Sequence, residues 1–177
     1  NPMGMQIGQQ YAPGGLTPLS TRAQNGSLPL AFSHEVSLVI SDADHLERGG
    51  IRPMKYIPDM SNLDKPENDY VLFRYADALL MKAEAIARGG SGSVGTIMAD
   101  LAARSGVTAA AATLDGIYAE RGRELWWEGW RRNDAIRFGK FLAARALKPY
   151  ASDAKYLLYP IPADALFNSN LTQNPGY

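Results

Sequence analysis

The sequence predicts a mainly α-helical protein with long loops and little strand. Over much of residues 69–177, apolar residues recur at spacings of three and four, the period of a helix with one buried face. Residues 1–68 are instead rich in Gly, Pro, Ser and Asn and contain only short apolar runs, which is typical of loops and short strands. We therefore expect a loop-rich segment with short strands at 1–68 and a helical region at 69–177.

A few short strands are expected in the loop-rich segment. Candidates are the apolar run at 37–41 and the stretch with the alternating Met54 and Tyr56. A connection longer than about 15 residues without regular structure is usually functional or belongs to a larger packed body. We therefore expect this segment to pack against a part of the protein outside this sequence.

The residue pattern predicts no metal site and no cofactor. His34 and His45 are too isolated to form a metal cluster, and solvated loop histidines are the better interpretation. Asp42 and Asp44 are similar to the start of a calcium loop, but the Gly and the closing Glu are missing at the required offsets. The chain has no cysteine, which removes thiolate ligands and thiol catalysis.

A first helix is expected from about residue 69 to 88. Its apolar face consists of Leu72, Tyr75, Ala76, Leu79, Leu80, Ala83, Ile86 and Ala87. Asn68 or Asp69 can cap its start, and Gly89 can end it. Glu84 and Arg88 are one turn apart in the favourable order for an ion pair. Because the alanines on the apolar face let a second helix approach closely, we expect a helical hairpin.

Three more helices are expected before residue 140. The second covers 96–104, with Ile97, Met98 and Leu101 facing the first helix and Gly106 at its end. Thr113 is expected to cap a third helix that closes at residue 129, and a short fourth helix follows at 131–138.

The remainder of the chain is expected to be less regular. An extended segment is predicted at 156–159, and Pro162 is well placed to start a last helical turn that ends at Phe167. The final residues, 174–177, have Pro and Gly at the central positions of a type II turn.

The charge balance gives no reason to expect a nucleic-acid partner. Lys plus Arg and Asp plus Glu number 18 each, so the chain has no net charge to attract a polyanion. No stretch approaches the roughly 20 apolar residues of a spanning helix. The first residues resemble the middle of a loop and lack the pattern of a signal peptide, so we expect any processed leader to lie upstream.

Glu120, Glu124 and Glu128 lie four residues apart and share one helical stripe. They could form a cation site or a carboxylate pair for glycoside hydrolysis. The favoured interpretation is structural: the acids pair with Arg121, Arg123, Arg131 and Arg132 and fix how the helices meet. Because no nucleophile elbow, P-loop or dinucleotide fingerprint occurs either, we do not expect an enzyme.

Three tryptophans, Trp126, Trp127 and Trp130, lie within the next turn of the chain. An exposed indole can stack on the apolar face of a sugar ring. Tryptophans beside arginines also form cores or subunit contacts, with the guanidinium stacked on a ring. We expect one of the three to be exposed and functional.

Three segments in order resemble the C-terminal half of the SusD/RagB family. They are residues 74–85, the pattern Glu120-Arg121, Glu124-Leu125, Glu128-Gly129, Arg131-Arg132, Asp134 and Arg137, and residues 159–162 with 173–177. The stretch 50–56 resembles what precedes the first segment in the family. The resemblance therefore covers about residues 48–177.

This resemblance implies tetratricopeptide-like helix pairs within a larger single domain of which the chain is one part. It also implies a surface-exposed lipoprotein of the outer membrane, whose lipid anchor lies upstream of this sequence. Such a protein binds oligosaccharide or polysaccharide without chemistry and delivers it to a SusC-like TonB-dependent transporter. The alternative is a helical protein-docking module without a sugar site of its own.

No sugar-contacting residue transfers from the family by motif. The matching residues imply a structural ionic network: Arg74, Glu84, Glu120, Glu124, Glu128, Arg132 and Asp134. For ligand contacts we expect Tyr11, Phe32 and Tyr56 in the loop-rich segment, with Trp126, Trp127 and Trp130 as poorer candidates. If an upstream scaffold is missing, an apolar patch larger than a few hundred Å² is also expected on the surface.

Overall fold

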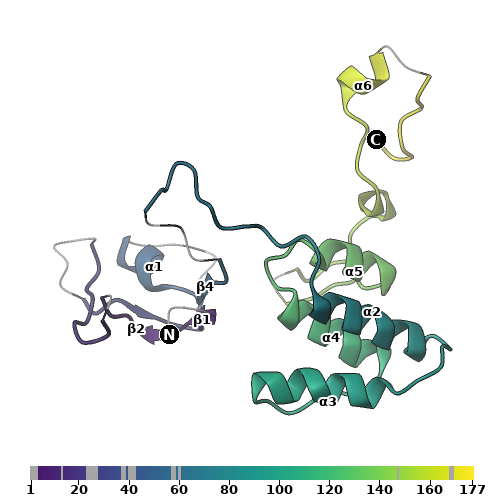
Figure 1. Ribbon diagram of the computed structural model, residues 1–177. Helices are drawn as coiled ribbons and strands as arrows, with labels where there is room; N and C mark the ends of the chain where they lie inside the picture. The colour runs from purple at the N-terminus through teal and green to yellow at the C-terminus, as the bar shows by residue number, and fades with distance from the viewer. Residues whose placement is uncertain are drawn as a thin grey trace. The chain divides into compact units, whose positions relative to one another are not determined.

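A computed structural model describes residues 4–12, 14–22, 28–36, 39, 43–56, 59, 61–146, 148–167 and 170–177. The chain forms two compact units, Asn1–Asp69 and Tyr70–Tyr177, each treated below on its own (Figure 1). The mainly helical fold class with little strand is confirmed. Among the described residues, each helix is too short or too polar to span a membrane.

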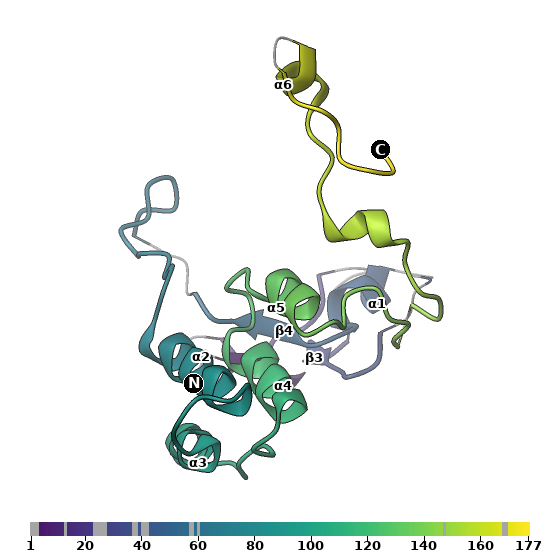
Figure 2. The same ribbon diagram turned by 90° about the vertical axis from the view of Figure 1, so that its right-hand side faces the viewer.

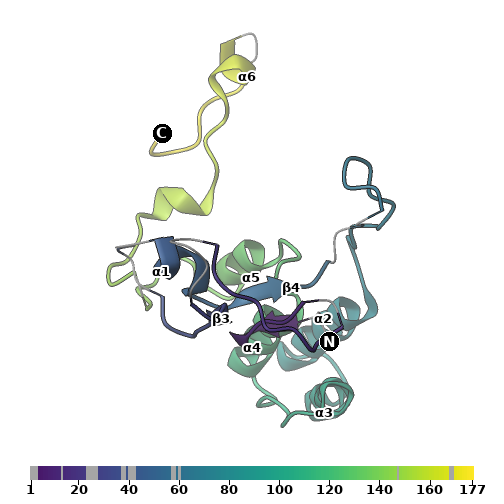
Figure 3. The ribbon, with the colours of Figure 1, turned by 90° about the vertical axis from the view of Figure 1, so that its left-hand side faces the viewer.

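In its described residues, the first unit contains two small antiparallel sheets and one short helix (Figure 3). β1 (Gly4–Gln6) pairs with β4 (Arg52–Met54), and β2 (Gly8–Gln9) pairs with β3 (Ala31–Phe32). Helix α1 spans Ala43–Arg48. The predicted strand with Met54 exists, but Tyr56 lies in a bend after it. Of the predicted strand at 37–41, only residue 39 lies within the described residues, and it is in a bend.

The second unit is a helical bundle with a long C-terminal segment. Its helices are α2 (Tyr75–Ala87), α3 (Val94–Ser105), α4 (Leu114–Glu124) and α5 (Arg131–Arg137). Helix α2 contacts both α3 and α4, and α4 contacts α5 (Figure 2). The predicted helical hairpin is therefore present. Its core consists of Ala76, Leu80, Ala83, Ile97, Met98, Leu101 and Ile117.

Three helix ends follow from single residues. The Ser93 side chain accepts a hydrogen bond from the Thr96 N–H at 3.2 Å and caps α3. As predicted, the Thr113 side chain caps α4 by accepting from the Gly116 N–H at 3.1 Å, and Gly106 ends α3 with a left-handed φ of 67°.

The start of α2 differs from the prediction. Arg74, not Asn68 or Asp69, is the N-cap, and its side chain makes no capping hydrogen bond. Its guanidinium instead binds the carboxylates of Glu124, at the end of α4, and of Glu128, which follows α4. Leu72 therefore precedes the helix and is 69% exposed, although the periodicity placed it on the buried face.

Two segments after residue 124 also differ. Helix α4 ends at Glu124, so Gly129 closes a following turn and not the helix itself. Residues 156 and 157, predicted to be extended, lie in the 3₁₀ helix η2 (Ala154–Leu157). The Asp153 carboxylate starts that helix by accepting from the Lys155 N–H at 2.8 Å, a local capping bond that the apolar pattern does not reveal.

The end of the chain follows the prediction. Helix α6 (Ala163–Phe167) begins directly after Pro162, whose carbonyl accepts from the Ala165 N–H. The Tyr177 N–H donates to the Asn174 carbonyl at 3.4 Å, and Gly176 has a φ of 91°, as a type II turn requires.

Candidate functional site

Arg74 connects the start of α2 to the end of α4. Its Nε donates to both carboxylate oxygens of Glu128, at 2.9 and 2.8 Å. Its Nη1 donates to the Glu124 carboxylate and its Nη2 to the Glu124 carbonyl. Arg104, from α3, binds the other Glu124 oxygen at 2.6 Å. The end of α4 and the turn that follows it are thereby held to the start of α2 and to α3.

A second group of charges is buried between α2, α4 and α5. Arg121 is 2% exposed; its Nη1 donates to Asp77 and its Nε to Asp134, both at 2.8 Å. Arg137 shares Asp134 at 3.0 Å and donates two hydrogen bonds to Glu84, at 2.7 and 2.8 Å. Buried charges of this kind need partners, since removing charge from water costs several kcal/mol per ion.

We call the full set the ionic frame: Arg74, Arg88, Arg104, Arg121 and Arg137 with Asp77, Glu84, Glu124, Glu128 and Asp134. It contains equal numbers of arginines and carboxylates and joins all of helices α2 to α5. Such a frame positions surface side chains, and its paired acids are poor groups for acid–base chemistry.

The frame shifts the proton affinities of its members. Burial favours the neutral acid at Glu84 and Glu124, but hydrogen bonds from arginines outweigh burial and hold both pKa values below the usual range. Hydrogen bonds to Glu84 raise the pKa of Arg137. At Arg74, burial alone would lower the pKa. The hydrogen bonds to Glu128 and Glu124 have the larger effect together with the charges of these two residues, so the pKa is raised.

The acidic stripe pairs with only one of the nearby arginines that the spacing suggested. Glu120 pairs with Arg123, whereas Glu124 and Glu128 pair with Arg74, which the family resemblance included in the network, and Glu124 also pairs with Arg104. Glycoside hydrolysis needs two open carboxyl groups about 5 to 10 Å apart, whereas the Glu124 and Glu128 side chains are buried in ion pairs. Within the described residues, no group of three His, Cys, Asp or Glu could hold a metal ion.

Arg132 also differs from its prediction as a frame member. Its Nη2 donates to the carbonyls of Tyr156 at 2.9 Å and Leu157 at 3.4 Å. Its guanidinium stacks on the rings of Phe141 and Tyr159, at 5.0 and 4.0 Å from their centroids. It therefore orders the C-terminal segment, and its charge faces neutral groups there.

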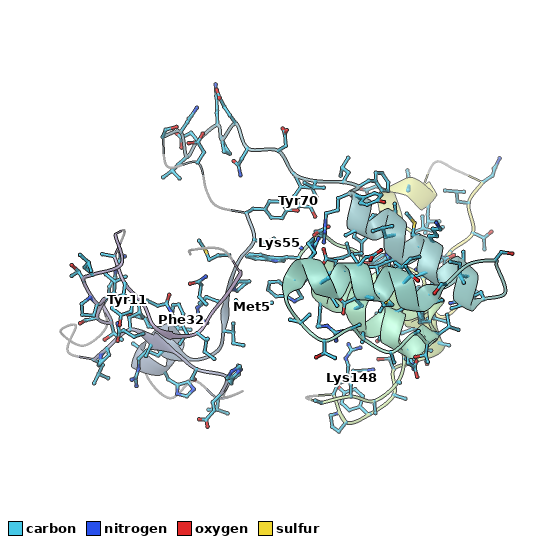
Figure 4. All side chains as sticks on the ribbon, turned by 60° about the horizontal axis from the view of Figure 1, so that its bottom comes forward. Met5, Tyr11, Phe32, Lys55, Tyr70 and Lys148 are labelled. Atoms are coloured by element: carbon cyan, nitrogen blue, oxygen red, sulfur yellow. The ribbon has the colours of Figure 1, made fainter. Side chains whose placement is uncertain are left out.

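The candidate aromatic side chains of the loop-rich unit differ in how exposed they are. Tyr11 is 52% exposed beside the isolated bridge to Pro18, whereas Phe32 is half-buried in β3 under the Arg52 guanidinium at 5.0 Å. Tyr56 is half-buried in the bend after β4. Figure 4 shows Tyr11 and Phe32 in the same small unit. Of the three, Tyr11 has the ring most open to a ligand.

Two of the three tryptophans form an exposed pair. The rings of Trp126 and Trp127 are 5.5 Å apart and tilted by 36°, and Trp127 is 59% exposed. Trp130 is half-buried against Phe73, with centroids 5.7 Å apart. Trp127 has a φ of 66°, a left-handed conformation that is costly for a large side chain, in the turn that follows α4.

Sequence reasoning missed one further feature, a hollow of about 400 Å³ in the second unit. Its lining residues are Arg132, Phe141, Arg145, Lys148, Ser152, Tyr156, Leu158, Tyr159 and Tyr177. The alternation of basic and aromatic residues after 140 is the signal that could have found it. We call it the C-terminal hollow.

Comparison with known proteins identifies relatives of one kind. The model of the SusD family matches residues 44–156. The starch-binding protein SusD of Bacteroides thetaiotaomicron is 36% identical over 129 residues, which are 67% of this chain and 23% of that protein.

Two solved structures share the fold. Surface glycan-binding protein A from Bacteroides thetaiotaomicron, in complex with laminarihexaose, is 33% identical with a TM-score of 0.55 over 62% of this chain and 26% of its own. A laminarin-binding SusD-like protein is 30% identical with a TM-score of 0.60 over 80% of this chain and 31% of its own. The chain thus spans about a quarter to a third of the length of these relatives.

Proposed function

The chain belongs to the SusD family, and from this premise we propose that it binds an oligosaccharide or polysaccharide at the cell surface. The bound glycan is then delivered to a SusC-like TonB-dependent transporter, with no bond made or broken. The protein is held at the outer membrane as a surface-exposed lipoprotein.

One observation carries the proposal. Three relatives that are at least 30% identical to this chain are associated with glucans. One is named for starch, one solved structure holds laminarihexaose, and another is named for laminarin. A glucan is therefore the first ligand class to test.

The exposed aromatic pair supplies a surface suited to such a ligand. Trp126 and Trp127 follow directly after α4, where Glu124 and Glu128 are bound by Arg74. Rings held on a rigid base lose little conformational entropy when a sugar stacks on them. Tyr11 offers a second exposed ring, in the first unit.

Calorimetric titration of the protein that carries this chain with laminarihexaose and with a malto-oligosaccharide tests the proposal. Trp126→Ala, Trp127→Ala and Tyr11→Ala are the test variants, and Tyr75→Ala, which removes a ring that is 78% exposed, is the matched control. A variant that loses about 1.4 kcal/mol of stacking binds about tenfold more weakly. Absence of binding to both glucans, or equal loss in the control, contradicts the proposal.

Two further measurements address the non-catalytic role and delivery. Incubation with laminarihexaose is expected to release no new reducing ends, because Glu124 and Glu128 are committed to arginines. A SusC-like transporter is expected to co-purify with the protein from outer membranes, and intact cells should expose it to antibody. New reducing ends, or a protein found only inside the cell, contradict the proposal.

A protein-docking module is the second candidate. It is favoured by apolar side chains at the start of α2, where Leu72, Phe73 and Tyr75 are 69%, 74% and 78% exposed. Under this candidate the protein binds neither glucan, and replacing Leu72 and Phe73 by Ser abolishes capture of a protein partner. Glucan binding that the same replacement leaves unchanged favours the first candidate.

A further inference from the structure

The C-terminal hollow is lined by positive charges for which the described residues provide no carboxylate partner. Arg132, Arg145 and Lys148 line it, and none of its lining residues is acidic. The Lys148 Nζ donates to the carbonyls of Leu142 and Ala143, at 3.1 and 3.2 Å, and Arg132 also donates to carbonyls. These bonds satisfy donors, but no ion pair between these cations and a carboxylate occurs among the residues that the structure describes.

The ionic frame of the same unit differs from the hollow in this respect. Every arginine of the ionic frame faces at least one carboxylate, so the fold has the means to neutralise cations where they only hold helices together. In the described part of the chain, the exposed Arg145 guanidinium makes no hydrogen bond or ion pair, and two backbone bonds to Lys148, at 2.8 and 2.9 Å, hold the main chain that carries it. A guanidinium without a partner is a ready binding group for a carboxylate or a sulfate.

The hollow also presents aromatic rings. Tyr156, Tyr159 and Tyr177 are 47%, 67% and 44% exposed. The Tyr177 hydroxyl donates to the carbonyls of Lys155 and Leu158, which holds this ring in place. Arg132 covers one face of the Tyr159 ring at 4.0 Å and so fixes its orientation. Rigid tyrosines of this kind offer flat surfaces to the apolar face of a pyranose.

We propose that the C-terminal hollow is a second glycan subsite, selective for an anionic pyranose that bears a carboxylate or a sulfate group. The sugar ring stacks on Tyr156 or Tyr159, and its anionic group binds the Arg145 guanidinium with support from Lys148. The volume of about 400 Å³ is at the lower end of the ~300–1,000 Å³ range of ligand sites, which suits one or two sugar residues and not a long chain. The inference rests on the proposed glycan-binding function and names a different ligand class and site for it.

The test compares three probes on the protein that carries this chain: a tetragalacturonate, a sulfated chondroitin tetrasaccharide and the neutral laminarihexaose. Calorimetry at low and at physiological salt gives each dissociation constant. Binding of at least one acidic probe, weakening as salt rises, is expected because exposed charges are screened. The probe that binds identifies the carboxylate or the sulfate as the recognised group.

The variants separate this subsite from the glucan site. Arg145→Gln is expected to weaken acidic binding roughly fivefold or more, since a charge-assisted hydrogen bond is lost. Arg145→Lys should restore part of that loss, and Tyr159→Ala should weaken the same probe. Lys82→Gln removes an exposed charge from helix α2 and is the matched control. A circular dichroism spectrum and a melting curve exclude unfolded variants.

The two proposals fail in different ways. If laminarihexaose binds and neither acidic probe does, or if acidic binding is unchanged in Arg145→Gln and Tyr159→Ala, the C-terminal hollow is not a subsite. If an acidic probe binds through Arg145 and no glucan binds, the glucan assignment fails and the subsite stands. Equal loss in Lys82→Gln shows a general charge effect and overturns the subsite.

Discussion

Single charged residues determine how the helical unit holds together. Arg121 contributes two buried hydrogen bonds to carboxylates on two other helices, and one oxygen of Asp77 accepts no hydrogen bond within the described residues. A buried ion pair of this kind adds little stability compared with a well-packed apolar substitute. Removal of one member, however, leaves the other charges buried without a partner. The frame is therefore sensitive to removal of any single charge.

Arg121→Met is expected to lower the free energy of unfolding by about 3–5 kcal/mol, because it leaves Asp77 and Asp134 buried with less compensation. Urea denaturation followed by circular dichroism measures the change. Arg123→Ala is the control: its side chain is 60% exposed in its pair with Glu120, so the change should stay within about 1 kcal/mol. Similar losses in both variants would show that burial of Arg121 is unimportant.

The lowered pKa values of Glu84 and Glu124 predict acid sensitivity. A carboxyl group whose pKa is lower in the folded than in the unfolded state binds more protons when unfolded. Its contribution to stability is then complete above the ordinary value of 4.5 and is lost as the pH falls through the lowered folded pKa. The midpoint of urea unfolding should be steady from pH 7 to 5 and fall below about pH 4.5. In Glu84→Gln the fall should be shallower, and an unchanged slope contradicts this assignment.

The backbone of Trp127 is in an unfavourable conformation at the surface. Its φ of 66° suits glycine, and the side chain is 59% exposed, so little packing is lost on its removal. Trp127→Gly should therefore raise the free energy of unfolding by about 0.5–1 kcal/mol or leave it unchanged, while glucan binding weakens. Trp127→Ala keeps the strain and should bind as weakly without the gain in stability. A clear loss of stability in Trp127→Gly would mean that the ring packs as part of the fold.

At the scale of helices, close backbone approach limits which residues fit in the first turn of α4. A Cβ added at Gly116 would lie 1.9 Å from the Ala111 carbonyl oxygen, a backbone atom that cannot move freely. Gly95 in α3 offers the opposite case, because its Cβ would meet only the Ser93 side chain at 3.9 Å. The two glycines therefore form a matched pair.

Gly116→Ala should destabilise the protein by at least about 2 kcal/mol through this clash, whereas Gly95→Ala should stabilise it by up to about 1 kcal/mol through helix propensity. Thermal unfolding of both variants checks the sign of each effect. A neutral Gly116→Ala would show that the segment before α4 is free to shift.

Local rules predict most of the helices but not the frame that joins them. Thr113, Gly106 and the apolar spacing of α2 and α3 act within a few residues, so their consequences are visible in the sequence. Arg74 and Glu128 are 54 residues apart, and nothing in the spacing of the acidic stripe selects Arg74 over nearer arginines. The same limit applies to the C-terminal hollow, whose lining is brought together by Arg132 binding main-chain carbonyls at 156 and 157.

Across the molecule, apolar burial is unequal between the two units. Within the described residues, every buried hydrophobic side chain belongs to the second unit, from Ala76 to Ala135. The first unit has two-stranded sheets and, as a buried side chain, Thr21. Two-stranded sheets are marginal by themselves in water. Exposed apolar residues also occur in both units. The expected apolar patch of more than a few hundred Å² remains a prediction.

This division predicts a graded pattern of hydrogen exchange. Amides in α2, α3 and α4 should be the slowest to exchange, because they open only when the core and the ionic frame come apart. Amides in β1, β2, β3 and β4 should exchange orders of magnitude faster, since their opening exposes little apolar surface. Exchange followed by mass spectrometry on the protein that carries this chain measures both. Strong protection of β1 and β4 would mean that another part of the protein covers the first unit, and its aromatic Tyr11 would then be a poorer candidate than Trp127 for glycan contact.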